Sequence, residues 1–300
     1  MTNTLITIVG ATAIGKTALS IQLAQHFNCD IISCDSRQFY KEMSIGTAVP
    51  NKKELEAAPH HFIQNRSVFD DYSVGQFERD ALATLEELFK KNPIQIMVGG
   101  SGLYVDAVLN GLDDFPDVDP SIRQELTKKF EQHGLAILQE ELLLLDPETY
   151  NSIALDNPHR VIRALEICIG TGKTYASFKN KPKTERNFNS IKIGLTADRE
   201  VMYNRINQRV DIMMQNGLLE ETKKLYLYKH LNALQTVGYR ELFDYFDGHF
   251  TLDFAIEEIK KNTRRFAKRQ GTWFRKDKNI VWFDFQENTQ HIIEIIKAKL

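Results

Sequence analysis

The sequence predicts an α/β fold: a parallel sheet with helices on both faces, interrupted by an inserted all-α domain. Short apolar runs alternate with helical stretches up to about residue 110 and again from residue 191, which is typical of strands that pair in parallel. A glycine-rich loop separates the first strand from the first helix. From Pro120 to about Lys179 the apolar residues follow a helical period, with no convincing strand.

These patterns divide the chain into two expected domains. The acidic, proline-broken segment DDFPDVDP marks the change of pattern at about Asp114, and residues 180–190 are a polar linker. We expect a core domain of residues 1–113 and 188–300 that carries the catalytic site. Residues 114–187 would form the helical domain.

The first strand and helix enclose a phosphate-binding loop. Leu5 to Val9 form a short, β-branched apolar run, and the residues from Ala18 continue as an amphipathic helix. Between them Gly10, Gly15, Lys16 and Thr17 match G-x-x-x-x-G-K-[ST], in the strand-loop-helix context that confirms a P-loop. We therefore expect a P-loop NTPase-like core.

A P-loop holds phosphates by its backbone and by two side chains. Its N–H groups surround phosphate oxygens at a helix N-terminus, Lys16 supplies a positive charge, and the Thr17 hydroxyl is a ligand for Mg²⁺. A di- or triphosphate should bind here. The residues expected to bind it are Gly10, Ala11, Thr12, Ala13, Ile14, Gly15, Lys16 and Thr17.

Two later strands should bring further polar residues to the same edge of the sheet. Asp30–Cys34 runs into Asp35–Gln38, and Ile94–Val98 runs into Gly99–Tyr104. Ligands of such sheets lie beyond the carboxyl ends of the strands. Residues 39–75 look loop-rich, and a helix follows from Val74 to Lys90.

Asp35 is the candidate general base or magnesium ligand at this edge, although such a carboxylate can also serve as a turn or helix cap. The glycines at 99, 100 and 102 stand where an ATP-hydrolysing P-loop protein would be expected to carry an acidic residue for its metal. Their lack of side chains suggests close backbone approach to a ligand.

Beyond the helical domain, Ile191–Leu195 resumes the strand pattern, and a helix follows from about Asp198. A long helix is expected over Leu252–Phe274, and Ile280–Phe285 closes the sheet. Arg205 and Arg209 share a helical face after the fourth strand and could reach the phosphates.

The long helix and its exit concentrate positive charge beside aromatic residues. In a chain of formal net charge −2 this is a local surface for a polyanion, with a solvated helix face as the alternative. In the helical domain Arg160 and Arg163 share a face and could bind phosphates, or could be ordinary solvated arginines. The cations of the long helix and its exit are Lys260, Lys261, Arg264, Arg265, Lys268, Arg269, Arg275, Lys276 and Lys278, and the aromatic residues are Phe266, Trp273 and Phe274.

Composition sets outer limits. Three hundred residues with 42% hydrophobic content suffice for one or two cores. The three cysteines have no spacing that suggests zinc or a disulfide framework. The first strand starts almost at the N-terminus, which leaves no room for a signal peptide, and no apolar run approaches membrane-spanning length. We expect a cytoplasmic monomer with no membrane partner.

The motifs together resemble those of the tRNA dimethylallyltransferase family, the tRNA isopentenylpyrophosphate transferases. The resemblance covers nearly the whole chain, and two stretches are specific: DSRQFYKEMSIGTAVP and NTRRFAKRQGTWFRK. Ala11 departs from the usual Pro, and His159 from the usual Gln. The chain lacks the zinc-finger extension of eukaryotic relatives, so it looks bacterial. The other matching stretches are GATAIGKT, PHHFI, YSVGQFERDA, GGSGLY, NPHRVIRALEI, RVDIMMQNGLLEE and QTVGYRE.

The resemblance implies a prenyl transfer to tRNA. The P-loop would hold the diphosphate of dimethylallyl diphosphate, with Lys16, Thr17 with Mg²⁺, and Arg209 stabilising the departing diphosphate. Asp35 would accept a proton from the exocyclic N6 amine of the adenosine 3′ of the anticodon, which must leave its stack. The resemblance assigns contacts with the anticodon stem-loop of tRNA to Asp35, Ser36, Arg37, Gln38, Ser101, Arg123, His159, Arg160, Val161, Ile162 and Arg163.

Three alternatives share some of these features. A small-molecule P-loop kinase fits the P-loop but fits the Asp35-Ser36 motif and the basic helix less well. An isopentenyltransferase acting on free adenine nucleotides shares the donor site and Asp35, but the basic helix and the helical domain favour a large polyanion. A nucleotide-gated RNA-binding module would bind tRNA and leave its mass unchanged.

Overall fold

The computed structural model describes residues 2–179 and 185–300 and divides into two compact units. The core unit consists of Met1–Leu109 and Arg186–Leu300, and the helical unit of Asn110–Glu185. The boundaries expected from the sequence, 114 and 187, lie a few residues beyond these. Part of the polar linker expected at residues 180–190 lies outside the described residues.

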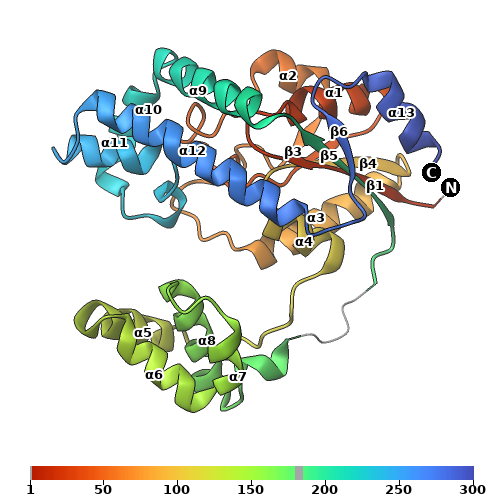
Figure 1. Ribbon diagram of the computed structural model, residues 1–300. Helices are drawn as coiled ribbons and strands as arrows, with labels where there is room; N and C mark the ends of the chain where they lie inside the picture. The colour runs from red at the N-terminus through yellow and green to blue at the C-terminus, as the bar shows by residue number, and fades with distance from the viewer. Residues whose placement is uncertain (1, 180–184) are drawn as a thin grey trace. The chain divides into compact units, whose positions relative to one another are not determined.

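The core unit is built on a six-stranded parallel sheet (Figure 1). Strand β1 lies in its middle, with Thr4 paired to Ile94 on one side and to Asn189 on the other. Because all strands are parallel, their carboxyl ends share one edge. The order is β3-β2-β4-β1-β5-β6, with β1 at Thr4–Gly10, β2 at Ile31–Ser33, β3 at His60–His61, β4 at Ile94–Val98, β5 at Asn189–Thr196 and β6 at Val281–Asp284.

Helices cover both faces of this sheet, as the sequence predicts. Ile6 and Ile8 of β1 pack toward α1 (Lys16–Phe27) and α13 (Thr289–Lys297). Leu5 and Val9 pack toward α3 (Val74–Phe89), α4 (Gly102–Asn110) and the end of α12 (Leu252–Phe274). The alternation of side chains along a strand therefore gives each face its own apolar core. The predicted bounds of the long helix α12 are confirmed.

The segment expected to be loop-rich, residues 39–75, contains two short elements that the sequence analysis missed. Helix α2 (Lys52–Ala57) begins with a capping box, in which Asn51 Oδ1 accepts the N–H of Glu54 and the Glu54 carboxylate accepts the N–H of Asn51. Strand β3 has only two residues, both histidines, and pairs with β2. Neither element is long enough to show a period.

The remaining helices of the core unit lie between β5 and β6 in the chain. Tyr239, which is fully buried, lies in the small core that joins several of them to Tyr40 and Met43. These helices are α9 (Arg199–Gln215), α10 (Leu218–Leu225), α11 (Tyr239–Phe246) and the short 3-10 turns η2 (Tyr226–Tyr228) and η3 (Asn232–Leu234).

The helical unit contains helices only, within its described residues 110–179 and 185. Leu138, Leu142 and Leu165 are completely buried in its core. Asp119, Asp146 and Asn157 each cap a helix whose next residue is proline, which agrees with the sequence at residues 157–158. The helices are α5 (Pro120–His133), α6 (Leu135–Leu145), α7 (Pro147–Ser152), α8 (Pro158–Thr171) and η1 (Tyr175–Phe178).

Across residues 2–179 and 185–300, no helix combines the length and the apolar character that crossing a membrane would require.

Candidate active site

Two adjoining pockets lie in the core unit around the carboxyl ends of the strands. The P-loop pocket, of about 530 Å³, is lined by residues 12–18 and by side chains of α9. The second pocket, of about 560 Å³, is lined by Ser36, Ser101 and α12. Seven residues line both pockets, so the two cavities adjoin along this set of residues. The shared residues are Thr12, Asp35, Thr47, Ala48, Arg209, Phe266 and Gln270.

The P-loop has the backbone that its glycines require. Gly10 has a φ of 145°, and a Cβ there would lie 2.7 Å from the carbonyl oxygen of Leu195. Gly15 has a φ of 111° and precedes the first turn of α1. Residues Thr12 to Thr17 line the pocket, whereas Gly10 and Ala11, which the sequence also predicted to bind phosphate, are not among its lining residues. The loop therefore presents backbone N–H groups and a helix N-terminus to one pocket.

Lys16 is held against its own loop. Its Nζ donates hydrogen bonds to the carbonyl oxygens of Gly10, at 3.0 Å, and Ala11, at 2.7 Å. Burial lowers the pKa of Lys16 from 10.5 to about 8, with Asp35 opposing this shift and Arg209 adding to it. The amine is therefore a desolvated cation that an incoming anion would stabilise.

Helix α9 directs two arginines into the P-loop pocket. Arg209 Nη1 lies 3.4 Å from Thr12 Oγ1, and Arg205 Nε donates to the carbonyl oxygen of Ala13 at 2.9 Å. Burial lowers the pKa of Arg209, while Asp35 opposes that shift. A guanidinium remains charged at neutral pH, so α9 and Lys16 together make the P-loop pocket a site for a polyanion.

Asp35 stands where the two pockets meet. Its Oδ1 accepts the N–H of Arg37 at 3.1 Å. The next residue, Ser36, contacts Ser101, since its N–H donates to Ser101 Oγ and the two hydroxyl oxygens are 3.2 Å apart. The predicted meeting of the β2 and β4 loops at one edge is thus confirmed. Arg37 lines the second pocket, and Gln38 lines the P-loop pocket.

The glycines after β4 line the pockets, Gly99 the P-loop pocket and Gly100 and Gly102 the second one, and they also lie against side chains of the protein. A Cβ at Gly99 would lie 2.5 Å from Cys34 Sγ, one at Gly100 would lie 2.2 Å from Gln270 Nε2, and one at Gly102 would lie 2.4 Å from the Trp273 ring. The space that a side chain would need at each glycine is occupied by Cys34, Gln270 or Trp273. These glycines let β2 and α12 approach the loop closely.

Gln270 is a site residue that the sequence analysis missed. Its Oε1 accepts the N–H of Thr12, and its Nε2 donates to the carbonyl oxygen of Gly100, both at 2.9 Å. This side chain joins α12 to the P-loop and to the β4 loop. The signal available in the sequence was the spacing of Gln270, which places it on the same face of α12 as the apolar residues Ala267 and Phe274.

The charge along α12 is uneven. Lys260 pairs with Asp211 at 2.9 Å, and Lys261 pairs with Glu258, so carboxylates neutralise the first cations of the basic stretch. Further along, Arg265, Lys268 and Arg269 are exposed, and Arg269 lines the second pocket with Phe266 and Trp273. The exposed positive charge therefore lies toward the second half of the helix, beside aromatic rings.

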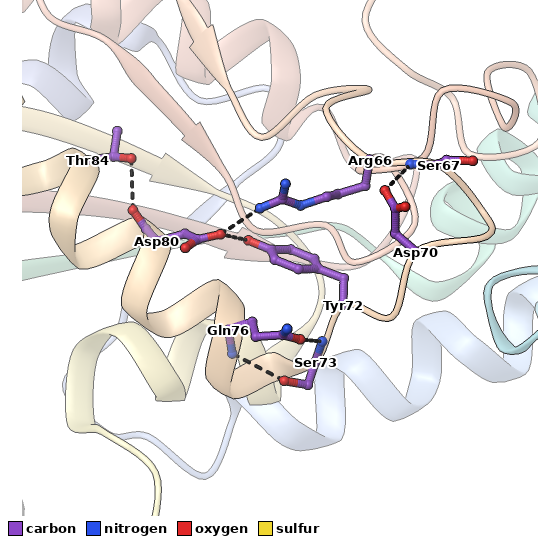
Figure 2. A network of polar contacts seen from close by, with 8 residues as sticks. All are labelled: Arg66, Ser67, Asp70, Tyr72, Ser73, Gln76, Asp80 and Thr84. Carbon is purple, nitrogen blue, oxygen red and sulfur yellow. Dashed lines mark hydrogen bonds and ion pairs between the residues drawn. The ribbon is translucent and has the colours of Figure 1, made fainter.

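A polar network supports the loop that follows Asp35 (Figure 2). Arg66 Nη2 pairs with Asp80 of α3 at 2.7 Å, and the same carboxylate oxygen accepts the Tyr72 hydroxyl at 2.9 Å. The backbone of Arg66 bonds in turn to Phe39 and Lys41. This network connects residues 39–41 to α3.

In the helical unit, the expected tRNA-contacting residues have unequal exposure. Val161 and Ile162 are buried in the core of the unit, whereas His159 and Arg160 are exposed on α8. Arg163 pairs with Glu166 at 3.0 Å, and Arg123 lies 3.9 Å from the same residue. Only the polar members of this set therefore present side chains to a partner.

The fold and the site define a P-loop protein with a polyanion pocket that opens beside a second, aromatic-lined pocket. The sequence profile described as IPP transferase matches residues 38–277. The chain belongs to the IPP transferase family.

Proteins of known name and structure are similar over nearly the whole chain. A tRNA dimethylallyltransferase of Flavobacterium psychrophilum is 61% identical over 304 residues, covering 99% of each chain. The crystal structure of a tRNA isopentenylpyrophosphate transferase from Bacillus halodurans is 38% identical, with a TM-score of 0.73 and coverage of 99% of this chain and 95% of that one. A eukaryotic dimethylallyltransferase acting on tRNA is 28% identical, with a TM-score of 0.84 and coverage of 99% and 79%.

Proposed function

We propose that this protein transfers a dimethylallyl group from dimethylallyl diphosphate to the N6 amine of the adenosine 3′ of the anticodon in tRNA. The observation that carries the proposal is the shared wall of the two pockets. Asp35 and Arg209 line both, so a base and a diphosphate-binding cation border the place where donor and acceptor would meet. The names of the relatives support tRNA as the acceptor and dimethylallyl as the transferred group.

The P-loop pocket suits the donor's diphosphate. Lys16, Arg209 and the P-loop N–H groups would stabilise the negative charge that grows on the diphosphate as its bond to the prenyl carbon breaks. Thr17 and Asp35 both line this pocket and offer the hard oxygen ligands that Mg²⁺ prefers. We propose that Thr17 holds Mg²⁺ here, where the ion would neutralise diphosphate charge.

The acceptor step needs a base, because the exocyclic amine of adenosine is a poor nucleophile. The N6 nitrogen forms a bond to the first prenyl carbon, and the carbon–oxygen bond of the donor breaks with its electron pair going to the diphosphate. Asp35 takes the proton that N6 loses. Holding both substrates at one wall supplies the alignment that this displacement requires.

Apolar groups of the P-loop pocket would shelter the prenyl carbon while it carries partial positive charge. Ile14 and Val98 line that pocket beside Phe266, whose ring borders both pockets. An aromatic face stabilises a nearby cation, and apolar walls exclude the water that would otherwise capture it.

The tRNA would deliver its flipped adenosine to the second pocket. We propose that Asp35, Ser36, Arg37, Gln38 and Ser101 contact the anticodon loop, and that the exposed cations of α12 bind its phosphates. The stem would be bound by Arg123 and the α8 stretch, in which Val161 and Ile162 position His159, Arg160 and Arg163. One chain supplies the lining of both pockets, so we propose a monomer that acts in the cytoplasm, where its tRNA substrate is found.

The test is a mass analysis of an unmodified anticodon stem-loop incubated with the protein, Mg²⁺ and dimethylallyl diphosphate. We expect the mass of a five-carbon unit to appear on the adenosine. Binding without any gain in mass would favour an RNA-binding module. A gain on adenosine monophosphate alone would favour a nucleotide-level transferase, and consumption of ATP with a phosphorylated product would favour a kinase.

Donor affinity should depend on pH through Lys16. Below pH 8 the amine is protonated in the free protein and binds the diphosphate; as pH rises through about 8 it loses this proton. Because the bound anion favours the protonated form, affinity should fall by up to about tenfold per pH unit above 8. Calorimetric titration with dimethylallyl diphosphate from pH 7 to 9.5 measures this. The Lys16→Ala variant is the control, because the donor's own ionisation affects it as much as the wild type. If donor affinity had the same slope against pH in both proteins, the assignment of the pH dependence to Lys16 would be wrong.

A further inference from the structure

A half-buried carboxylate outside both pockets holds the loop that lies between them. Glu221 of α10 faces three successive backbone N–H groups. Its Oε2 accepts from Ser44 at 3.0 Å and from Ile45 at 2.9 Å, and its Oε1 accepts from Gly46 at 3.0 Å. Successive N–H groups of this kind form an anion-binding concavity. Here the anion is a side chain that lies more than 170 residues away in the sequence.

Tyr239 completes this arrangement. Its hydroxyl donates to Glu221 Oε1 at 2.6 Å, and its ring is completely buried. A Cβ at Gly46 would lie 2.6 Å from that ring, so the loop fits between the ring and the carboxylate only because residue 46 is glycine. Burial raises the pKa of Tyr239 far above its ordinary value, which keeps the hydroxyl protonated as a donor.

The residues that follow form the wall between the pockets. Gln38 Nε2 donates to the carbonyl oxygens of Thr47, at 3.1 Å, and Ala48, at 3.0 Å. Ala48 has a φ of 50°, a left-handed conformation that a non-glycine residue keeps only when its surroundings impose it. Thr47 and Ala48 line both pockets, with Gly46 in the second pocket and Val49 in the P-loop pocket.

From this geometry we propose that Glu221 is a positioning residue for the transfer reaction, acting through residues 44–48 to set the distance between the bound donor and the bound adenosine. The inference rests on the proposed function. Glu221 lines neither pocket, so it touches neither substrate. Its carboxylate holds one end of the shared wall, and Gln38 holds the other.

The discriminating variant is Glu221→Gln. It keeps the size of the side chain, but one oxygen becomes an NH₂ group that meets an N–H donor instead of accepting from it. Displacing residues 44–48 should disturb the alignment of the two bound substrates more than the affinity for either substrate. A shift of about 1 Å costs about 100-fold in rate. We therefore expect kcat to fall about 100-fold, while the dissociation constants of donor and stem-loop change less than about threefold.

Two further readouts separate positioning from loss of fold. Hydrogen exchange at the amides of residues 44–46 should become faster in Glu221→Gln, with unchanged exchange in the sheet. Tyr239→Phe removes one hydrogen bond and keeps the ring, so its loss of kcat should be smaller and in the same direction. If Glu221→Gln does not fold, Tyr239→Phe carries the same test.

The matched control is Glu220→Gln, an exposed neighbour on the same helix, which should behave like the wild type. An unchanged kcat in Glu221→Gln, or a loss that follows the unfolded fraction, would overturn the inference. So would weakened substrate binding with kcat intact. Failure of the wild-type protein to add a prenyl group would instead overturn the proposed function, so the two failures are distinguishable.

Discussion

Asp35→Asn should lower kcat by about 10²- to 10⁴-fold, the usual contribution of a general base. The substitution preserves the local fold, because the Asn oxygen can still accept the N–H of Arg37 that Asp35 Oδ1 accepts at 3.1 Å. What disappears is the ability to take the proton from N6. Single-turnover measurement of prenyl transfer to a stem-loop, with the donor saturating, isolates this step from binding.

The pH of that measurement matters, because the negative charge of Asp35 raises the pKa of Lys16. In Asp35→Asn this charge is absent, so the pKa of Lys16 should be lower than in the wild type. At pH 7 Lys16 remains protonated in the wild type, and donor affinity is compared directly by calorimetry. Asp71→Asn, an exposed aspartate outside both pockets, serves as the matched control and should leave kcat unchanged. Turnover at the wild-type rate in Asp35→Asn would rule out the base.

Lys16→Ala should weaken the binding of dimethylallyl diphosphate by about 10- to 100-fold. A hydrogen bond to a charged group contributes about 1.5–3 kcal/mol, and each 1.4 kcal/mol is tenfold in affinity. Equilibrium titration with the donor measures the change. Lys90→Ala, at the exposed end of α3, is the control and should bind the donor normally.

Thermal unfolding of the same variant gives a second, opposite expectation. The pKa of Lys16 is lowered in the folded state, so its protonated form costs the free protein about 3 kcal/mol below pH 8, and this cost declines as the pH rises from about 8 to 10.5. Alanine removes that cost together with two hydrogen bonds to the P-loop. The Tm should therefore not fall. A weakened donor affinity together with a lower Tm would point to damage of the loop instead.

The sheet and its helices were largely predictable because their signals are local. Leu5 to Val9 form an apolar strand, and the amphipathic pattern of α12 persists long enough to define both of its ends. β3 escaped prediction for the opposite reason: two histidines carry no period, and His60–His61 forms a strand only because β2 offers an open edge.

The P-loop was predictable because its sequence motif specifies the backbone conformation of the loop. The contact between Ser36 and Ser101 was predictable because the order of parallel strands brings the loops after β2 and β4 to one edge of the sheet. Gln270 and Glu221 were missed because their function lies in partners more than 170 residues away. The packing of the glycines after β4 against Cys34, Gln270 and Trp273 was missed for a related reason. A missing side chain indicates close approach, but the sequence does not say whether a ligand or a Trp273 ring approaches.

The position of β1 also has a consequence for biosynthesis. This strand pairs with β5 from Thr4↔Asn189 onward, and the helical unit lies between the two in the chain. A ribosome must therefore synthesise nearly two thirds of the protein before the strand that leads into the P-loop gains its second neighbour. Until then its apolar edge remains open to wrong pairing, as is usual for parallel sheets built from distant segments. The helical unit, whose contacts are local in sequence, can fold before β5 has been synthesised.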